Sequence, residues 1–144
     1  MRFMMIVKAT NDSEAGVMPS QELITAMTRY NEELVKAGIL LAADGLHASS
    51  SGIRISYPIP GGKPVVTDGP FAETKELIGG YWLIEARSRE EAIEWAMRAP
   101  DPHGHGDGEI ELRQVFETPE LTQDPEALAR DVFLREQVDR LKHS

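Results

Sequence analysis

Asp68 and His47 are the two side chains of this sequence best suited to proton transfer. His47 follows a predicted short strand at residues 39–43, and Asp68 opens the segment Asp68-Gly69-Pro70-Phe71. A neutral imidazole at a strand end can act as a general base, and a nearby carboxylate can fix its tautomer. Such a pair suits proton abstraction next to a carbonyl, or the hydrolytic removal of a small leaving group.

The same residues also have a structural interpretation. An Asp that accepts backbone N–H bonds, a Gly, a Pro that fixes φ and a Phe that anchors the chain together make a tight turn. His47 stands close to the run Ser49-Ser50-Ser51, which has the composition of a flexible surface loop. The residue types therefore leave both interpretations open, an acid/base site or an anchored turn.

Four further side chains are candidates for ligand binding. Lys75 can hold an anionic substrate, and the hydroxyl of Tyr81 can point into a pocket. Tyr30 and Arg29 are neighbours on a predicted helix, where Arg29 can bind a carboxylate. The alternatives are core positions for the two tyrosines and exposed positions for the two cations. We expect a small anionic or carbonyl-containing ligand.

The segment His103-Gly104-His105-Gly106-Asp107 contains metal-binding residue types at close spacing. No third histidine lies nearby, and neither of the usual helical or calcium-loop motifs is present. The glycines do not follow a phosphate-loop order and precede a predicted strand. We therefore expect a loop here, with no metal and no cofactor.

The composition limits the classes of partner. The chain has 144 residues, no cysteine and a formal charge of −9. That acidity argues against a nucleic-acid partner and against an anionic membrane, because both need basic surfaces. The apolar part of residues 1–8 is too short for a signal sequence or a membrane span. We expect a cytoplasmic protein without disulfides or thiolate chemistry.

Hydrophobic periodicity predicts a mixed α+β domain. Strands are expected at 2–9, 39–43, 81–86 and 109–116, helices after the capping residues Ser20 and Ser88, and a loop at 11–19. An inserted hairpin is expected from 52–57 and 64–67. Without the hairpin, the order is β-α-β-β-α-β, the ferredoxin-like arrangement. Residues 1–117 form this predicted domain, and 118–144 a helical extension.

The strands that begin at Phe3 and Tyr81 are apolar on both faces. A ferredoxin-like sheet has helices on one face only, so its second face needs another cover. A second copy of the same sheet is the simplest cover and predicts a symmetric homodimer. The hairpin or the tail of the same chain is the competing explanation.

The stretch Val66-Thr67-Asp68-Gly69-Pro70-Phe71-Ala72-Glu73-Thr74-Lys75-Glu76, followed by Gly79-Gly80-Tyr81, resembles the signature of the DGPF group of YCII-related proteins. Gly45-Leu46-His47 and the strand at 109–113 resemble further parts of that family. The resemblance covers roughly residues 1–117 and leaves out the tail.

The resemblance implies a ferredoxin-like fold that pairs into a dimeric α/β barrel. It also implies a His/Asp pair in a cleft, for which His47 and Asp68 are the candidates here. Proton-transfer chemistry of the isomerase, lyase or dehalogenase type is one expected function. A non-catalytic binding or regulatory dimer, linked to a sigma-factor response, is the other.

Overall fold

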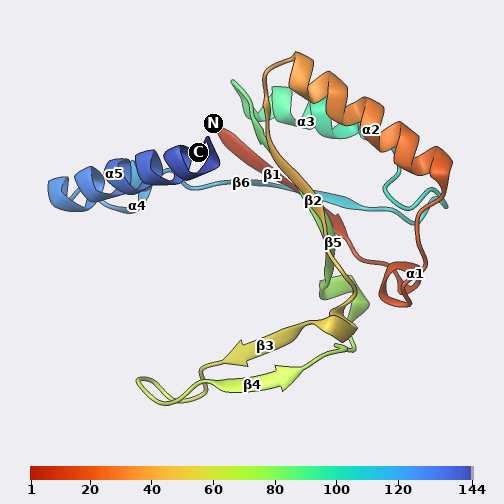
Figure 1. The fold of residues 1–144 in the computed structure, drawn as a ribbon, viewed down its shortest axis with the longest axis horizontal. Helices are drawn as coiled ribbons and strands as arrows, with labels where there is room; N and C mark the ends of the chain where they lie inside the picture. The colour runs from red at the N-terminus through yellow and green to blue at the C-terminus, as the bar shows by residue number, and fades with distance from the viewer. Residues whose placement is uncertain (144) are drawn as a thin grey trace. The chain divides into compact units, whose positions relative to one another are not determined.

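The structure, a computed structural model, describes residues 1–143 and divides into two compact units. The first unit spans Met1–Gln114, and the second begins at Val115. The first unit contains a four-stranded sheet, two long helices and a separate two-stranded hairpin (Figure 1).

The main sheet has the strand order β2-β5-β1-β6, and all neighbours are antiparallel. Its strands are β1 (Arg2–Lys8), β2 (Leu40–Gly45), β5 (Ile78–Glu85) and β6 (Ile110–Gln114). The first and last strands along the chain are therefore neighbours, and β5 separates β1 from β2. This is the ferredoxin-like order once the hairpin is set aside, so the predicted α+β fold class is confirmed.

Two serine-capped helices connect these strands. In α2 (Gln21–Lys36), the Ser20 hydroxyl accepts a hydrogen bond from the Leu23 N–H at 3.1 Å. In α3 (Arg89–Arg98), Ser88 accepts one from the Glu91 N–H at 3.1 Å. Each cap satisfies an N–H group that the first helical turn leaves without a partner, as the sequence predicted.

Both long helices lie on the same face of the sheet (Figure 1). Alternate residues of the central strands point toward them and are buried, including Phe3, Met5 and Ile84. Tyr30 and Leu34 of α2 complete this core from the other side. The space between the helices and the sheet is thus filled by these side chains.

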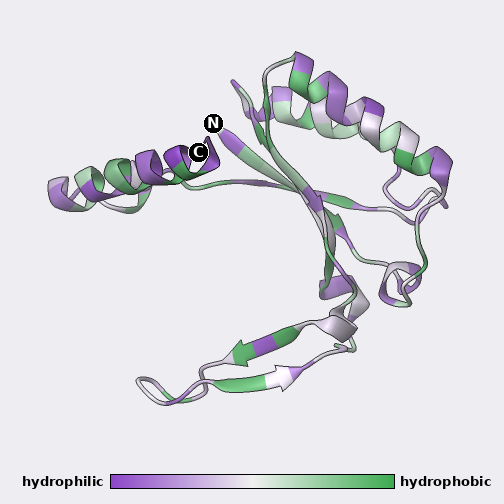
Figure 2. Cartoon of the chain, in the orientation of Figure 1, coloured by the Kyte–Doolittle hydropathy of each residue, from purple (hydrophilic) through white to green (hydrophobic). Residues whose placement is uncertain are grey.

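The other face of the sheet is covered by neither α2 nor α3, and we call it the open face. Met4, Ile6, Tyr81 and Leu83 point to this side and remain partly exposed. They alternate with the buried residues of the same strands, as period-two geometry requires. Hydrophobic segments run through both central strands in Figure 2.

The hairpin consists of β3 (Ile53–Ser56) and β4 (Val65–Asp68), which pair only with each other. It was predicted from the turn residues between two short alternating runs. Every residue of the two strands is exposed, so the hairpin does not cover the open face. Of the two segments of the same chain that could cover the open face, the hairpin is therefore excluded.

The expected loop at 11–19 instead begins with a short helix, α1 (Asn11–Glu14). The sequence prediction was wrong here because it missed a local capping box. Thr10 Oγ1 accepts a hydrogen bond from the Ser13 N–H at 3.2 Å, and Ser13 Oγ accepts one from the Thr10 N–H at 2.9 Å. The reciprocal pair satisfies the N–H groups of one helical turn.

The second unit is helical, with α4 (Thr118–Leu121) and α5 (Pro125–Lys142). Asp124 caps α5, and its carboxylate accepts a hydrogen bond from the Ala127 N–H at 3.2 Å. Within α5, Arg135 forms an ion pair with Asp131 at 2.8 Å. The predicted C-terminal helix is therefore present. No helix in the described residues is both long and apolar enough to cross a membrane.

Candidate functional site

The Asp68-Gly69-Pro70-Phe71 turn is docked onto the 3₁₀ turn η1 (Ser49–Ser51). The Gly69 N–H donates a hydrogen bond to Gly52 O at 2.9 Å, and the Phe71 N–H donates one to Ser49 Oγ at 3.1 Å. The guanidinium of Arg54 stacks on the Phe71 ring at 3.8 Å from its centroid. The turn is thus anchored by backbone, hydroxyl and aromatic contacts together.

Glu14 joins the same contact network from α1. The Ser49 N–H donates to Glu14 Oε2 at 2.8 Å, and the Ser49 hydroxyl donates a short hydrogen bond to Glu14 Oε1. The hydroxyl therefore donates one hydrogen bond to Glu14 and accepts another from the Phe71 N–H. We call these three residues the Ser49 junction. The serine composition had suggested a flexible loop, and no sequence signal pointed to Glu14 as its partner.

His47 and Asp68 each stand close in sequence to a residue of this junction. His47 is exposed in the connection between β2 and η1, two residues before Ser49. Asp68 is exposed at the end of β4, directly before the anchored Gly69. Within residues 1–143, no hydrogen bond or ion pair joins the two side chains.

Tyr81 and Asp44 form a pair that composition did not reveal. The Tyr81 hydroxyl donates a hydrogen bond to Asp44 Oδ2 at 3.2 Å. The two residues face each other across β2 and β5, and Tyr81 points to the open face. The hydrogen bond to Asp44, followed by the charge of that carboxylate, raises the pKa of Tyr81 above its usual value. Strand register was the only signal that could have found Asp44.

The other three residues predicted to bind a ligand lie on elements other than β2 and β5. Tyr30 is buried, and its hydroxyl donates to Trp95 O at 2.6 Å, which ties α2 to α3. Its ring meets Trp82 edge to face at 5.4 Å. Burial, the largest cause, raises the pKa of Tyr30 to about 12. Arg29 is exposed on α2, and Lys75 is exposed on the 3₁₀ turn η2 (Thr74–Glu76).

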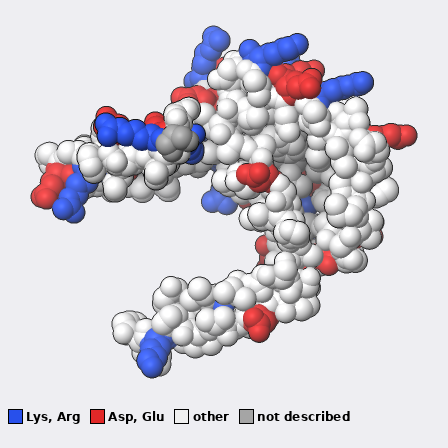
Figure 3. Space-filling model, viewed as in Figure 1, with Lys and Arg blue, Asp and Glu red and all other residues white. Residues whose placement is uncertain are grey.

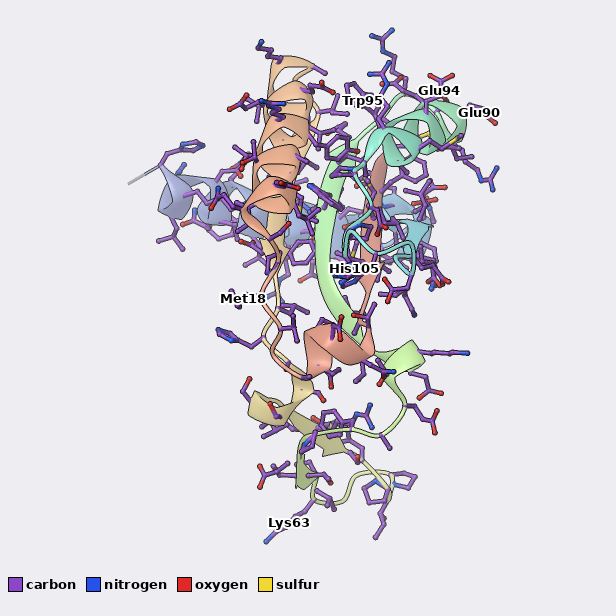
Figure 4. All side chains as sticks on the ribbon, turned by 90° about the vertical axis from the view of Figure 1, so that its right-hand side faces the viewer. Met18, Lys63, Glu90, Glu94, Trp95 and His105 are labelled. Carbon is purple, nitrogen blue, oxygen red and sulfur yellow. The ribbon has the colours of Figure 1, made fainter. Side chains whose placement is uncertain are left out.

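The histidine-rich segment forms a loop organised by Asp101, between α3 and β6, and Figure 4 shows His105 within it. The Asp101 carboxylate accepts backbone N–H bonds from His103 at 3.1 Å and from Gly106 at 2.7 Å. These bonds lower the pKa of Asp101. The His103 ring bonds to Lys8 O at 2.9 Å. The described residues contain no cluster of three or more potential metal ligands.

A shallow surface depression of about 700 Å³ lies at the C-terminal end of α2. Glu33, Lys36, Ala37, Trp95 and Arg98 line it. The Arg98 guanidinium covers the Trp95 ring at 4.6 Å. Figure 3 shows the charged side chains that gather over the two helices. This depression contains none of the six residues that the sequence singled out.

Comparison with known proteins adds the family. An uncharacterised protein of Rhizobium meliloti is 51% identical to this chain over 35 residues. That match covers 24% of this chain and 28% of the relative, so this chain matches less than a third of the relative's length. The YCII-related domain matches residues 1–119, which include the whole ferredoxin-like sheet, the hairpin and the Asp68–Phe71 turn. The chain therefore belongs to the YCII-related family.

Proposed function

We propose that this chain is a small-molecule-binding subunit of a homodimer, and that its open face lines the ligand site. The observation that carries the proposal is the Tyr81–Asp44 hydrogen bond at 3.2 Å, on the open face beside Met4, Ile6 and Leu83. Ligand sites typically combine apolar walls with a few placed polar groups. Between the helices and the sheet, buried side chains form the hydrophobic core.

The homodimer follows from the need to cover the open face. Met4, Ile6 and Leu83 would otherwise remain partly exposed in the middle of a sheet. A second copy brings the same apolar strands to the same place, which gives an isologous pair of the dimeric α/β barrel type. The two facing sheets would then enclose the polar pair of each subunit.

The chemistry of the polar pair defines the ligand class. A tyrosine hydroxyl that is already bonded to a carboxylate can rotate to donate to a ligand carbonyl or carboxylate. Lys75 is exposed just before β5 and offers a positive charge to an anionic ligand. Arg29 is exposed too, but it stands on α2, on the opposite face of the sheet, so we leave it out of this site. We leave Tyr30 out of the site, since its hydroxyl is bonded to Trp95 O.

A second candidate function is proton transfer by His47 and Asp68, in an enzyme of the isomerase, lyase or dehalogenase type. Its support is that both side chains are exposed and that each lies within three residues of the anchored Ser49 junction. An imidazole and a carboxylate held near one rigid turn can share a substrate without touching each other in its absence. A non-catalytic regulatory dimer is the alternative.

Ligand titration distinguishes these functions. Small carboxylates, lactones and halo-acids would be screened by ligand-observed NMR, with turnover followed for every binder. The proposal expects binding that Tyr81→Phe weakens and that Tyr30→Phe, which removes a hydroxyl from the core on the other side of the sheet, leaves unchanged. Loss of turnover in His47→Ala with binding intact supports proton transfer. Equal binding by the Tyr81 and Tyr30 variants contradicts the open-face site.

A further inference from the structure

The β3–β4 hairpin forms no strand pairs with the rest of the described chain. Its strands pair only with each other, and all of their residues are exposed. Two-stranded hairpins are marginally stable in water without a further packing partner. The exposed large apolar side chains of the hairpin are Ile53, Ile55, Tyr57, Ile59, Val65 and Val66.

Together these side chains form an apolar surface, and its exposure to water is unfavourable. Ile55 is 52% exposed, Val66 60% and Tyr57 74%. Ile55 and Val66 are direct cross-strand partners, so their exposed groups are contiguous. Figure 2 shows hydrophobic stretches on both strands. Contiguous exposed apolar surface of this kind marks a site of interaction.

The charge of the hairpin indicates which kind of surface it binds. The hairpin, Ile53–Asp68, contains two bases, Arg54 and Lys63, and one acid, Asp68, at its root. The hairpin therefore carries +1 and, since the chain as a whole has a charge of −9, the rest of the chain carries −10. Figure 4 places Lys63 at the far end of the hairpin. A basic apolar hairpin is attracted to an acidic protein surface and repelled by another hairpin of the same kind.

We propose that the hairpin is an arm that packs on the body of a second copy of this chain. This inference rests on the proposed homodimer and adds the element that joins its subunits. Two such contacts, exchanged in a symmetric pair, would close the assembly. The anchored turn at Gly69 and the Ser49 junction fix the arm at its root and so set its direction. An anionic membrane is the less favoured partner, because the charge of −10 on the rest of the chain opposes its approach.

Photo-crosslinking tests the arm directly, because the chain has no cysteine. Ile55→Cys would be labelled with a benzophenone and mixed with isotopically heavy wild-type chains. The proposal expects light–heavy crosslinked peptides between the arm and the body of the other chain. Met97→Cys on α3, at a position 81% exposed, is the matched control and should give few of them. Crosslinks confined to light peptides of the same chain overturn the proposal.

Dimer affinity separates the arm from the homodimer itself. Ile55→Asp and Val66→Asp should weaken dimerisation roughly tenfold or more, while Met97→Asp should not. Circular dichroism and thermal melting check that each variant folds. A wild-type dimer that both arm variants leave unchanged overturns the arm and spares the homodimer. A wild-type monomer overturns both, and arm-dependent flotation with anionic vesicles overturns the protein partner.

Discussion

Gly69 packs so closely against Ser49 that a Cβ atom at position 69 would overlap the Ser49 carbonyl oxygen. The backbone of Gly69 does not adopt a positive φ, so the requirement for glycine is steric and not conformational. The close approach lets the Gly69 N–H reach Gly52 O at 2.9 Å. The glycine of the Asp68–Phe71 turn is therefore explained by a contact with a distant segment.

Replacing Gly69 with Ala should push the turn away from η1. We expect the unfolding free energy to fall by about 1–3 kcal/mol, the usual cost of forcing an atom into a packed site. Urea unfolding of the full chain measures it. Gly45→Ala is the control, since a Cβ there would lie 4.0 Å from the nearest atom, Gly79 O. Equal losses in the two variants would contradict the steric explanation.

Removing the Ser49 hydroxyl should break two hydrogen bonds at once. Ser49→Ala takes the donor from Glu14 and the acceptor from the Phe71 N–H. We expect a loss of about 1–3 kcal/mol, because one of the bonds involves a charged group. Ser51→Ala, which loses only a bond from an exposed hydroxyl to Ala48 O, should cost less. Faster amide exchange at Phe71 in Ser49→Ala alone would locate the effect.

The raised pKa of Tyr30 predicts that the protein loses stability at alkaline pH. Burial raises its pKa from 10.0 to about 12, so the fold favours the neutral phenol. The contribution is complete below pH 10 and is lost as the pH rises toward 12. Unfolding free energies measured across that range should converge for wild type and Tyr30→Phe as the pH rises.

The pKa of Tyr81 should depend on Asp44. Asp44→Asn removes the carboxylate that accepts the hydrogen bond and carries the charge. The pKa of Tyr81 should then fall toward its ordinary value. Ultraviolet titration, with Tyr81→Phe used to assign the transition, measures the change. Asp12→Asn on α1 is the control, and an equal shift in that variant would refute a local cause.

Local patterns were predictable, and contacts between distant segments were not. The caps at Ser20 and Ser88 act within one helical turn, so residue type and spacing reveal them. The Ser49 hydroxyl meets Phe71 22 positions along the chain, and Asp44 meets Tyr81 37 positions along. Such contacts depend on strand register and loop path, which side-chain periodicity does not specify.

The two faces of the central strands illustrate the same limit. Alternation in β1 correctly indicated that Phe3 and Met4 point to opposite sides, and the structure buries Phe3 under the helices. Periodicity cannot state which face the helices take, because both sets of residues are apolar. Once the strand order is set, the right-handed preference of the β-α-β connection decides it.

The position of β1 between β5 and β6 has a consequence for synthesis on the ribosome. Among the described strands, β1 pairs with Ile78–Glu85 and Ile110–Gln114, both of which are translated much later than β1. Its apolar residues must therefore wait, unpaired, for most of the polypeptide to emerge. A nascent chain that stalls before Ile110 would lack β6 and leave one edge of β1 unpaired. Chaperones, or another nascent chain on the same messenger RNA, could bind that edge.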